Sequence, residues 1–128
     1  YDALVLMFQK EVAERIIAKP NDKAYGRLAV ISQWLCETKI VMTLPPNAFT
    51  PPPKVNSAVV LFKPKANPMA ASFENVEKIT AAAFGQRRKM IRQSLKSYAQ
   101  HFETLNLDPT VRAENLAVED FINLAQKI

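Results

Sequence analysis

The sequence has 128 residues, of which 48% are hydrophobic and 23% are charged, and its formal net charge is +5. This composition is typical of a globular protein and allows one ordinary domain or two small subdomains. No apolar run approaches the ~20 residues of a membrane span, which excludes an integral membrane protein of the helical kind. The positive charge mildly favours an anionic partner, with nucleic acid first.

The cysteine content and the first residues bear on where the protein works. Cys36 is the only cysteine, so no internal disulfide can form, and a reducing compartment, the cytoplasm, is expected. The first residues have no basic leader and no small-residue cleavage site, so they do not form a signal peptide. The sequence lacks an initiator methionine and opens inside an apolar run, and we expect it to be a piece of something longer.

The first half alternates between strand and helix patterns. Residues 3–8 form a continuous apolar run, which predicts a strand buried on both faces, as in a parallel α/β sheet. A helix is predicted from about residue 10 to Pro20, and a second helix opens at Tyr25. Residues 39–44 and 57–63 predict two strands, which a short irregular loop joins as an antiparallel pair.

The loop between these two strands is rich in proline. Each proline fixes φ and removes a backbone donor, so the loop cannot be helix or central strand and must be stiff and extended. Such a loop holds its one large aromatic residue, Phe49, in a set place. Two interpretations follow: a connector with Phe49 buried in the core, or one wall of a binding site that loses little entropy on binding.

The second half is predicted to be helical. The composition changes at residues 64–68, which we interpret as a linker between a unit at 1–64 and a unit at 65–128. Ser72 is a predicted N-cap, and Gly85 is the predicted end of the helix that follows it. A last helix is predicted after Ala117, where an N-cap hydroxyl is missing at a cost of ~1 kcal/mol.

A second predicted helix, residues 86–98, carries a run of positive charge. No acid occurs between Glu77 and Glu103. At about 100° per residue, three of its cations fall on one helix face. A solvated helix face is the ordinary interpretation of a charge run, but stable exposed helices usually mix signs, so nucleic-acid contact is an equal alternative. The cations are Arg87, Arg88, Lys89, Arg92 and Lys96.

Several kinds of active site are absent from the sequence. Gly26 and Gly85 are the only glycines, so there is no glycine-rich phosphate loop. His101 is the only histidine and has no metal-ligand partner at the required spacing, so no metal is expected. A complete active site cannot be assembled from these residues alone.

Five stretches together resemble a known family. They are 8–13 (FQKEVA), 25–28 (YGRL), 48–60 (AFTPPPKVNSAVV), 84–89 (FGQRRK) and 112–115 (RAEN). In this order and spacing they resemble the C-terminal half of the bacterial small-subunit rRNA adenine dimethyltransferases, the KsgA or RsmA type. The resemblance covers nearly the whole sequence, and the proline loop and the QRRK motif are its most specific parts.

The resemblance implies a fold, a cofactor and a partner. The expected fold class is α/β: the C-terminal remnant of a class I, Rossmann-like methyltransferase sheet, followed by a small all-α domain that binds rRNA. Residues 3–8 would be a central strand of that sheet. The cofactor would be S-adenosylmethionine, but the family's motifs for the cofactor and for the base acceptor lie upstream, so no cofactor-binding residue is expected in this chain. The partner would be small-subunit rRNA or the immature small ribosomal subunit.

The resemblance also assigns roles to residues. Phe49 matches the aromatic residue that stacks on the flipped-out target adenine, a contact worth roughly 1–3 kcal/mol per base. Lys54, beside this loop, is an expected phosphate contact. Arg87, Arg88 and Lys89 match a stretch implicated in rRNA contact.

Three functions follow as hypotheses. In the first, the parent protein is an enzyme that dimethylates the exocyclic amines of two adjacent adenines in 16S rRNA during ribosome biogenesis, and this chain alone is inactive. In the second, the chain is a non-catalytic rRNA- or ribosome-binding module. In the third, it belongs to the erythromycin-resistance type of rRNA adenine methyltransferase or to the branch of the mitochondrial transcription factor B proteins. A sheet that lacks its first strands would leave residues 3–8 uncovered, so self-association through them, or a cleavage product with disordered remnants, is also expected.

Overall fold

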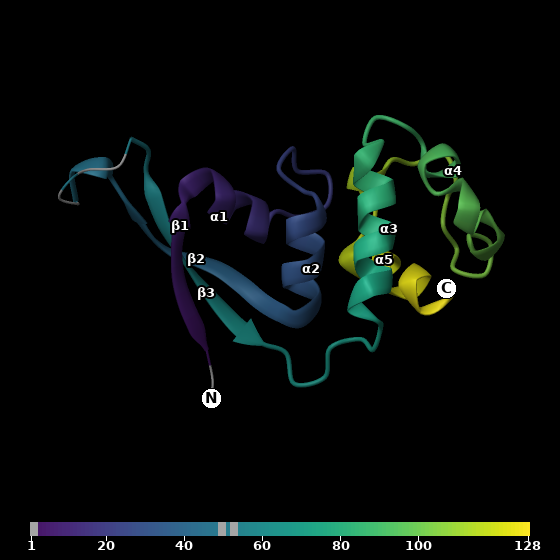
Figure 1. The fold of residues 1–128 in the computed structure, drawn as a ribbon, viewed down its shortest axis with the longest axis horizontal. Coiled ribbons are helices and arrows are strands. Elements are labelled where there is room, and N and C mark those ends of the chain that lie inside the picture. The colour runs from purple at the N-terminus through teal and green to yellow at the C-terminus, as the bar shows by residue number, and fades with distance from the viewer. Residues whose placement is uncertain (1–2, 49–50, 52–53) are drawn as a thin grey trace.

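The computed structural model describes residues 3–48, 51 and 54–128. The molecule is elongated, with a sheet at one end and a group of helices at the other (Figure 1). The sheet end contains β1 (Leu4–Gln9), α1 (Lys10–Ile17), α2 (Arg27–Leu35), β2 (Cys36–Leu44), a 3₁₀ turn (Pro46–Ala48) and β3 (Ser57–Pro64). The helical end contains α3 (Phe73–Gly85), α4 (Ile91–Ser94), two further 3₁₀ segments (Lys96–His101 and Ala113–Asn115) and α5 (Val118–Gln126).

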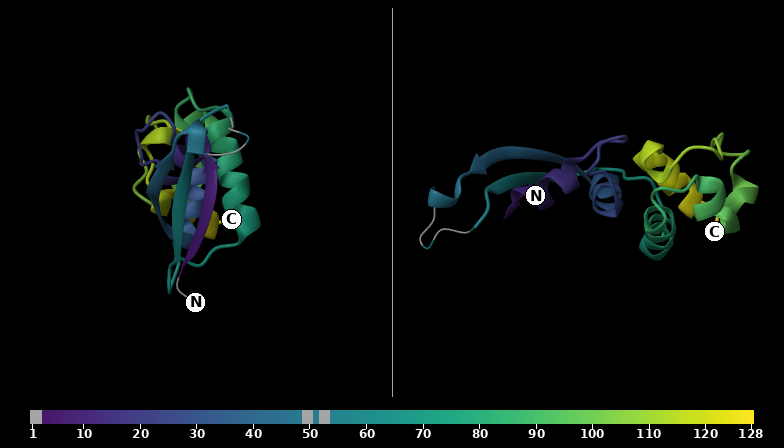
Figure 2. Two further views of the ribbon diagram at one scale, coloured as in Figure 1. Left: turned by 90° about the vertical axis from the view of Figure 1, so that its left-hand side faces the viewer. Right: turned by 90° about the horizontal axis from the view of Figure 1, so that it is seen from above.

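The three described strands lie in the order β1-β3-β2, and both pairs are antiparallel. The predicted antiparallel pair of β2 and β3 is therefore confirmed, although β2 begins at Cys36 and not at residue 39. Helix α1 lies on one face of the sheet (Figure 2). There, Ala58 and Val60 of β3 pack against Ala13 and Ile16 of α1. This small apolar cluster fixes α1 on the sheet.

The strand predicted at residues 3–8 forms as β1. Within the described residues it pairs with β3 alone, antiparallel, and it lies at the edge of the three-stranded sheet, so the parallel neighbour and the central position stay predictions. Leu4, Val5, Leu6 and Met7 are between 43% and 56% exposed, which agrees with the expectation that residues 3–8 are left uncovered. The reason is that α1 covers the centre of the sheet, and no further strand within the described residues pairs with the free edge of β1.

We expect the 128-residue chain to self-associate through this edge, because it combines unpaired backbone groups with consecutive exposed apolar side chains. Sedimentation velocity over a range of concentrations measures the association. A Val5→Lys variant should be shifted toward the monomer, because a charge on an edge strand opposes pairing. A matched Phe73→Lys variant, at an exposed apolar residue of α3, should associate like the unmodified chain. A monodisperse, unmodified monomer would contradict the expectation.

The helical end has its own core, which also takes in α2. Val30 and Trp34 of α2 belong to the same buried cluster as Ile79 of α3 and Phe121 of α5. The indole of Trp34 donates a hydrogen bond to the Met69 carbonyl at 2.6 Å, which ties the segment after β3 to α2. The division of the chain at residue 64 stays a prediction.

The predicted limits of α3 are confirmed at both ends. The Ser72 hydroxyl accepts a hydrogen bond from the Asn75 amide at 3.3 Å, as an N-cap should, and Gly85 is the last residue of the helix. The continuous helix predicted for residues 86–98 is wrong. A turn at 86–89 is followed by the four-residue α4 and a 3₁₀ segment.

The reason for the broken helix lies in the partner segment at 109–112. Met90 forms a bridge with Arg112, and the amide of Ile91 donates to the Val111 carbonyl at 2.7 Å. The amide of Arg92 likewise donates to the Pro109 carbonyl at 3.1 Å. These donors are therefore turned away from the preceding carbonyls that a helix would need. The cations of the segment consequently do not share one helix face.

The N-terminus of α5 offers a test of stability. Ala117 is its N-cap, and its amide donates to Asp120 Oδ2 at 2.9 Å, but no hydroxyl accepts the Asp120 amide. Ala117→Ser should raise the free energy of unfolding by about 1 kcal/mol, measured by urea denaturation. As a control, Ala81→Ser at an exposed position inside α3 should lower it slightly, because serine is a poorer helix former than alanine. Equal effects of both changes would refute the capping argument.

Candidate nucleic-acid interface

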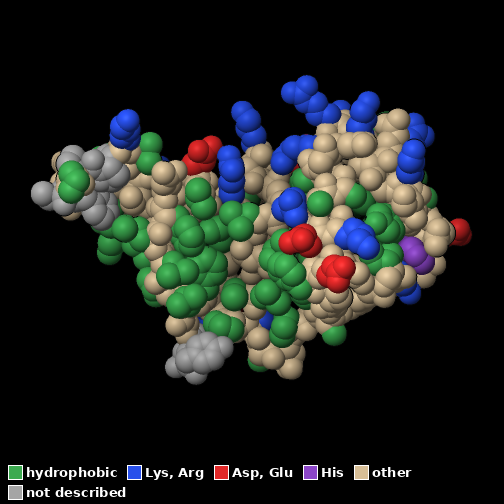
Figure 3. Space-filling model, in the orientation of Figure 1, with side chains coloured by type: hydrophobic (Ala, Val, Ile, Leu, Met, Phe, Trp, Pro, Cys, Tyr) green, Lys and Arg blue, Asp and Glu red, His purple; other side chains and the backbone are tan. Residues whose placement is uncertain are grey.

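Basic side chains gather along the upper edge of the molecule in Figure 3, from the sheet end to the helical end. The sequence has 17 lysines and arginines, yet in the described part of the chain the one ion pair joins Arg15 Nη2 and Glu11 Oε1, at 3.2 Å and on exposed side chains. Exposed ion pairs of this kind contribute little. The remaining cations of the described residues are free of ion pairs and would be stabilised by an anionic ligand.

A cavity of about 400 Å³ opens among several of these cations. We call it the basic groove and define it by its lining residues Arg15, Lys23, Ala24, Gly26, Arg27, Leu28, Phe84 and Arg87. Its cations come from α1, from the loop before α2, from the start of α2 and from the turn after α3, and no acidic residue lines it. Cations held this close repel one another, and a phosphate group would relieve the repulsion.

The groove is not equally positive along its length. On the side of α1, Glu11 and Glu14 join Arg15 and Lys23 around a smaller cavity of about 270 Å³. The carboxylates lower the positive potential there. The strongest positive potential is therefore expected toward Arg27 and the turn after α3.

Arg87 lines this groove and is only partly exposed. Its Nη1 donates to the Tyr25 carbonyl at 2.7 Å, and its Nη2 donates to the Lys23 carbonyl at 3.0 Å. Its guanidinium carbon lies 5.7 Å from the centre of the Phe84 ring, within the range of a cation–π contact. Of the predicted RNA contacts that the structure describes, Arg87 is thus the one whose charged group is bound inside the protein.

The other predicted cations after α3 are exposed. Arg88 and Lys89 lie in the turn at 86–89, Arg92 lies in α4, and Lys96 begins the following 3₁₀ segment. The structure brings Arg87 together with the basic groove, and it places the other four on the surface beyond it. Met90, which forms a bridge with Arg112, lies between Arg88 and the pair Arg92 and Lys96.

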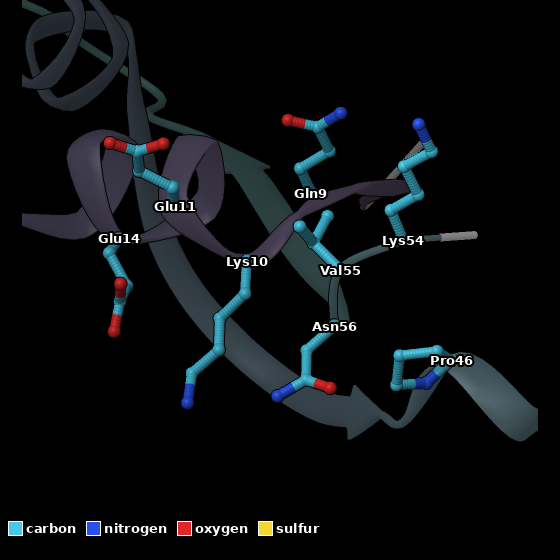
Figure 4. A pocket seen from close by; sticks show the side chains of 8 residues that line it. All are labelled: Gln9, Lys10, Glu11, Glu14, Pro46, Lys54, Val55 and Asn56. Atoms are coloured by element: carbon cyan, nitrogen blue, oxygen red, sulfur yellow. The ribbon is translucent and has the colours of Figure 1, made fainter.

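Lys54 borders a second cavity, of about 440 Å³, at the base of the proline loop. The cavity lies between β1, α1 and both ends of that loop (Figure 4). In this view the side chains of Lys54 and Gln9 point to one side, whereas those of Lys10 and Asn56 point to the other. The Lys10 amide donates to the Asn56 carbonyl at 2.9 Å, which fixes the loop exit against the start of α1.

Phe49, the predicted stacking residue, lies outside the described residues. Its neighbours on the N-terminal side form the 3₁₀ turn Pro46–Ala48, in which the Ala48 amide donates to the Pro45 carbonyl at 3.0 Å. Its role stays a prediction.

The loop at 18–26 is held by hydrogen bonds to residues 114–116 as well as by Arg87. The buried Tyr25 hydroxyl donates to the Leu116 carbonyl at 2.8 Å, and the Asn21 amide donates to the Glu114 carbonyl at 2.7 Å. Burial raises the pKa of Tyr25 well above its usual value, and the nearby charges of Glu119 and Asp120 raise it further. The hydroxyl therefore stays protonated and keeps this hydrogen bond throughout the physiological pH range.

Neither a glycine-rich cradle nor a cluster of metal ligands occurs among the described residues. Gly26 caps α2 beside the Arg87 guanidinium, and Gly85 ends α3, so neither glycine lies in a strand-to-helix turn that could cradle a ligand. Within the described ranges, no three His, Cys, Asp or Glu side chains come together as metal ligands. No helix of these ranges is long and apolar enough to cross a membrane.

Sequence reasoning missed three cations of the basic groove: Arg15, Lys23 and Arg27. They are scattered through the first half of the sequence and are accompanied there by acids, so no charge run marks them. The one usable signal is that Lys23 and Arg27 flank the Tyr25-Gly26 pair. Only the packing of α2 against α3 brings them to Arg87.

A model of the family described as ribosomal RNA adenine dimethylase matches residues 2–128. The chain is 54% identical to ribosomal RNA small subunit methyltransferase A of Cereibacter sphaeroides and 52% identical to that of Afipia carboxidovorans. All of the chain is covered in both cases, but only 48% and 47% of the relatives. The chain therefore spans about half the length of the curated relatives it matches.

Two solved structures are similar to this one. A dimethyladenosine transferase from Plasmodium falciparum matches 97% of this chain, and 56% of its own length, with a TM-score of 0.81 and 25% identity. The 23S rRNA methyltransferase ErmE matches 98% of this chain, and 54% of its own length, with a TM-score of 0.63 and 20% identity. The second likeness shows the fold alone.

Proposed function

Because the chain belongs to the ribosomal RNA adenine dimethylase family, we propose that it is the rRNA-contacting part of an S-adenosylmethionine-dependent enzyme that dimethylates two adjacent adenines of small-subunit rRNA. The proposed partner is the immature small ribosomal subunit, and the proposed compartment is the cytoplasm. The 128 residues alone are expected to bind RNA without transferring methyl groups, because they span about half the length of the relatives and neither of their two glycines lies in a strand-to-helix turn that could cradle the methyl donor.

The observation that carries this proposal is the basic groove. Four cations from separate parts of the chain line one cavity that no acid lines. RNA presents phosphates at regular intervals, so a groove of this kind neutralises several of them and releases their counterions. Arg88 and Lys89, exposed beside the groove, extend the proposed phosphate contacts.

We propose that the sheet end, residues 1–64, is the C-terminal part of a class I methyltransferase sheet, and that residues 65–128 form a helical rRNA-binding domain. The structural likeness to the Plasmodium falciparum dimethyladenosine transferase over nearly the whole chain supports this assignment. In that arrangement, the free edge of β1 is where a further strand would pair.

The proline loop is the proposed contact with the target base. Phe49 supplies an apolar face for an adenine that has left its stack, and Lys54 supplies a charge for the adjacent phosphate. We assign no described residue to the methyl donor. The part proposed for this chain in the reaction is to bind the RNA and to orient the adenine.

Binding to unmethylated small-subunit rRNA, transcribed in vitro, tests the proposal. The affinity of the 128-residue chain should fall at least about tenfold between about 50 mM and 200 mM salt, because several phosphates are contacted. An affinity that does not change with salt would overturn the basic groove as the RNA site. Methyl transfer should require the chain extended to the length of its relatives, and transfer by the 128 residues alone would overturn the proposed division of labour.

The same assay separates the alternative functions. A non-catalytic module predicts binding without any methyl transfer, even by the extended protein. A resistance-type enzyme predicts that the extended protein methylates large-subunit rRNA in preference to small-subunit rRNA. Incubation of both RNAs with radiolabelled S-adenosylmethionine decides between these outcomes.

A further inference from the structure

Arg87 differs from the other predicted RNA contacts because its guanidinium already has partners within the protein. We propose that Arg87 is a positioning residue: it holds the loop before α2 so that Lys23 and Arg27 line the basic groove. The inference rests on the proposed function, in which this groove binds phosphates of rRNA. It replaces direct phosphate contact as the main role of Arg87.

The geometry requires an arginine. Two N–H groups on different nitrogens reach two carbonyls, those of Lys23 and Tyr25, at 3.0 and 2.7 Å. The planar guanidinium presents these donors as a fixed fork on two nitrogens, whereas a lysine ammonium has its donors on one nitrogen at the end of a flexible stem and does not reproduce the fork. Lysine at position 87 would keep the charge of the groove but would lose the pair of hydrogen bonds to the loop carbonyls.

The guanidinium is itself held in place. It lies over the Phe84 ring, which in turn contacts the Tyr25 ring edge-on, with ring centres 5.9 Å apart. Phe84 also packs against Phe121 of α5, with ring centres 5.4 Å apart. Arg87 thus connects the helical core to the carbonyls of the loop through well-packed groups, and little side-chain entropy remains to be lost on RNA binding.

The middle of the loop depends on this contact. Two hydrogen bonds to the 113–116 segment hold other parts of the loop: one from the Asn21 amide and one from the Tyr25 hydroxyl. The carbonyls of Lys23 and Tyr25 face the groove side and are held by Arg87. Without the guanidinium, the backbone that carries Lys23 and leads into Arg27 would lose its constraint on that side.

Two roles of Arg87 give different salt dependences. Each phosphate contact contributes roughly 0.7 to 0.9 to the slope of log affinity against log salt. If Arg87 positions Lys23 and Arg27, both Arg87→Ala and Arg87→Lys should lower the slope by about 1.4–1.8, the value of two contacts. If Arg87 is only a direct contact, Arg87→Ala should lower it by the value of one contact, and Arg87→Lys should leave it nearly unchanged.

The experiment measures the affinity of the full 128-residue chain for unmethylated small-subunit rRNA over a salt series. Arg88→Ala and Arg88→Lys, at the exposed neighbour, are the matched controls, and Arg88→Lys should keep the slope of the unmodified chain. In addition, Arg87→Ala and Lys23→Gln should be non-additive when combined, whereas Arg88→Ala and Lys23→Gln should be additive. A loss of folded protein alone would lower the apparent affinity without changing the slope.

Hydrogen exchange without RNA provides a measurement that does not depend on the proposed function. Amides of residues 23–26 should exchange faster in both Arg87 variants, and at the unmodified rate in both Arg88 variants. Additive energies together with unchanged exchange would overturn the positioning role while leaving the RNA-binding function intact. Absence of salt-dependent RNA binding by the unmodified chain would overturn the proposed function, and the exchange rates would still decide whether Arg87 holds the loop.

Discussion

Neutralising Lys23 and Arg27 together, as Lys23→Gln/Arg27→Gln, is expected to weaken binding of small-subunit rRNA by about 10- to 50-fold at about 0.1 M salt. Both residues line the basic groove, which no acid lines, so each contributes to the neutralisation of phosphates. The salt slope should fall by about 1.4–1.8 at the same time. Fluorescence anisotropy with labelled RNA at several salt concentrations measures both quantities.

The matched control is Lys63→Gln/Lys127→Gln, which removes the same charge from two exposed lysines that do not line the groove. This variant should lower the affinity only slightly, through the smaller net charge of the protein. Equal losses in the two double variants would mean that net charge and not the groove determines binding. The folded state of both variants is checked by thermal unfolding, which substitutions at exposed lysines should leave almost unchanged.

Phe49→Ala is expected to lower kcat/KM for adenine methylation by about 5- to 150-fold, in the protein extended to the length of its relatives. The expectation follows from the loss of one base-stacking contact worth roughly 1–3 kcal/mol, with about 1.4 kcal/mol for each factor of ten. Binding of bulk rRNA should change little, since the phosphate contacts of the groove are untouched. Methyl transfer to unmethylated small-subunit rRNA is the measurement.

Phe49→Tyr is the control, because tyrosine keeps an aromatic face of the same size. It should retain most of the activity if stacking is the role of this position. Activity that survives Phe49→Ala would rule out the stacking role. A loss of activity in both variants would also contradict the stacking role, because it would mean that the edge of the phenylalanine ring, where tyrosine carries its hydroxyl, makes the important contact.

Much of the fold follows from local chemistry that can be recognised in the sequence. The alternating apolar side chains of residues 57–63 predicted β3, and the pairing with β2 follows from the short connection between them. Ser72 and Gly85 marked the limits of α3, because a hydroxyl satisfies free amides at a helix start and a glycine ends a helix easily. These signals are local, so they need no knowledge of distant residues.

The prediction that failed depended on distant partners. The apolar pattern of residues 3–8 identified a strand but could not identify its neighbours, and within the described residues its one partner is β3. The periodicity of residues 86–98 is helical, yet the amides of Ile91 and Arg92 bond to carbonyls about twenty residues further along the chain. A pattern in one segment cannot report a competing hydrogen-bond partner in another.

The sequence by itself determined the strand pair, the limits of α3, the positive charge and the family resemblance, because each is written in neighbouring residues or in short motifs. Only the tertiary structure decided which cations act together. Lys23 and Arg27 lie some sixty residues before Arg87 in the sequence. They come close to it because α2 packs into the core of the helical end. The tertiary structure also decided that Arg87 donates hydrogen bonds to backbone carbonyls. The positions of those carbonyls depend on the folded loop and are not recorded in any sequence motif.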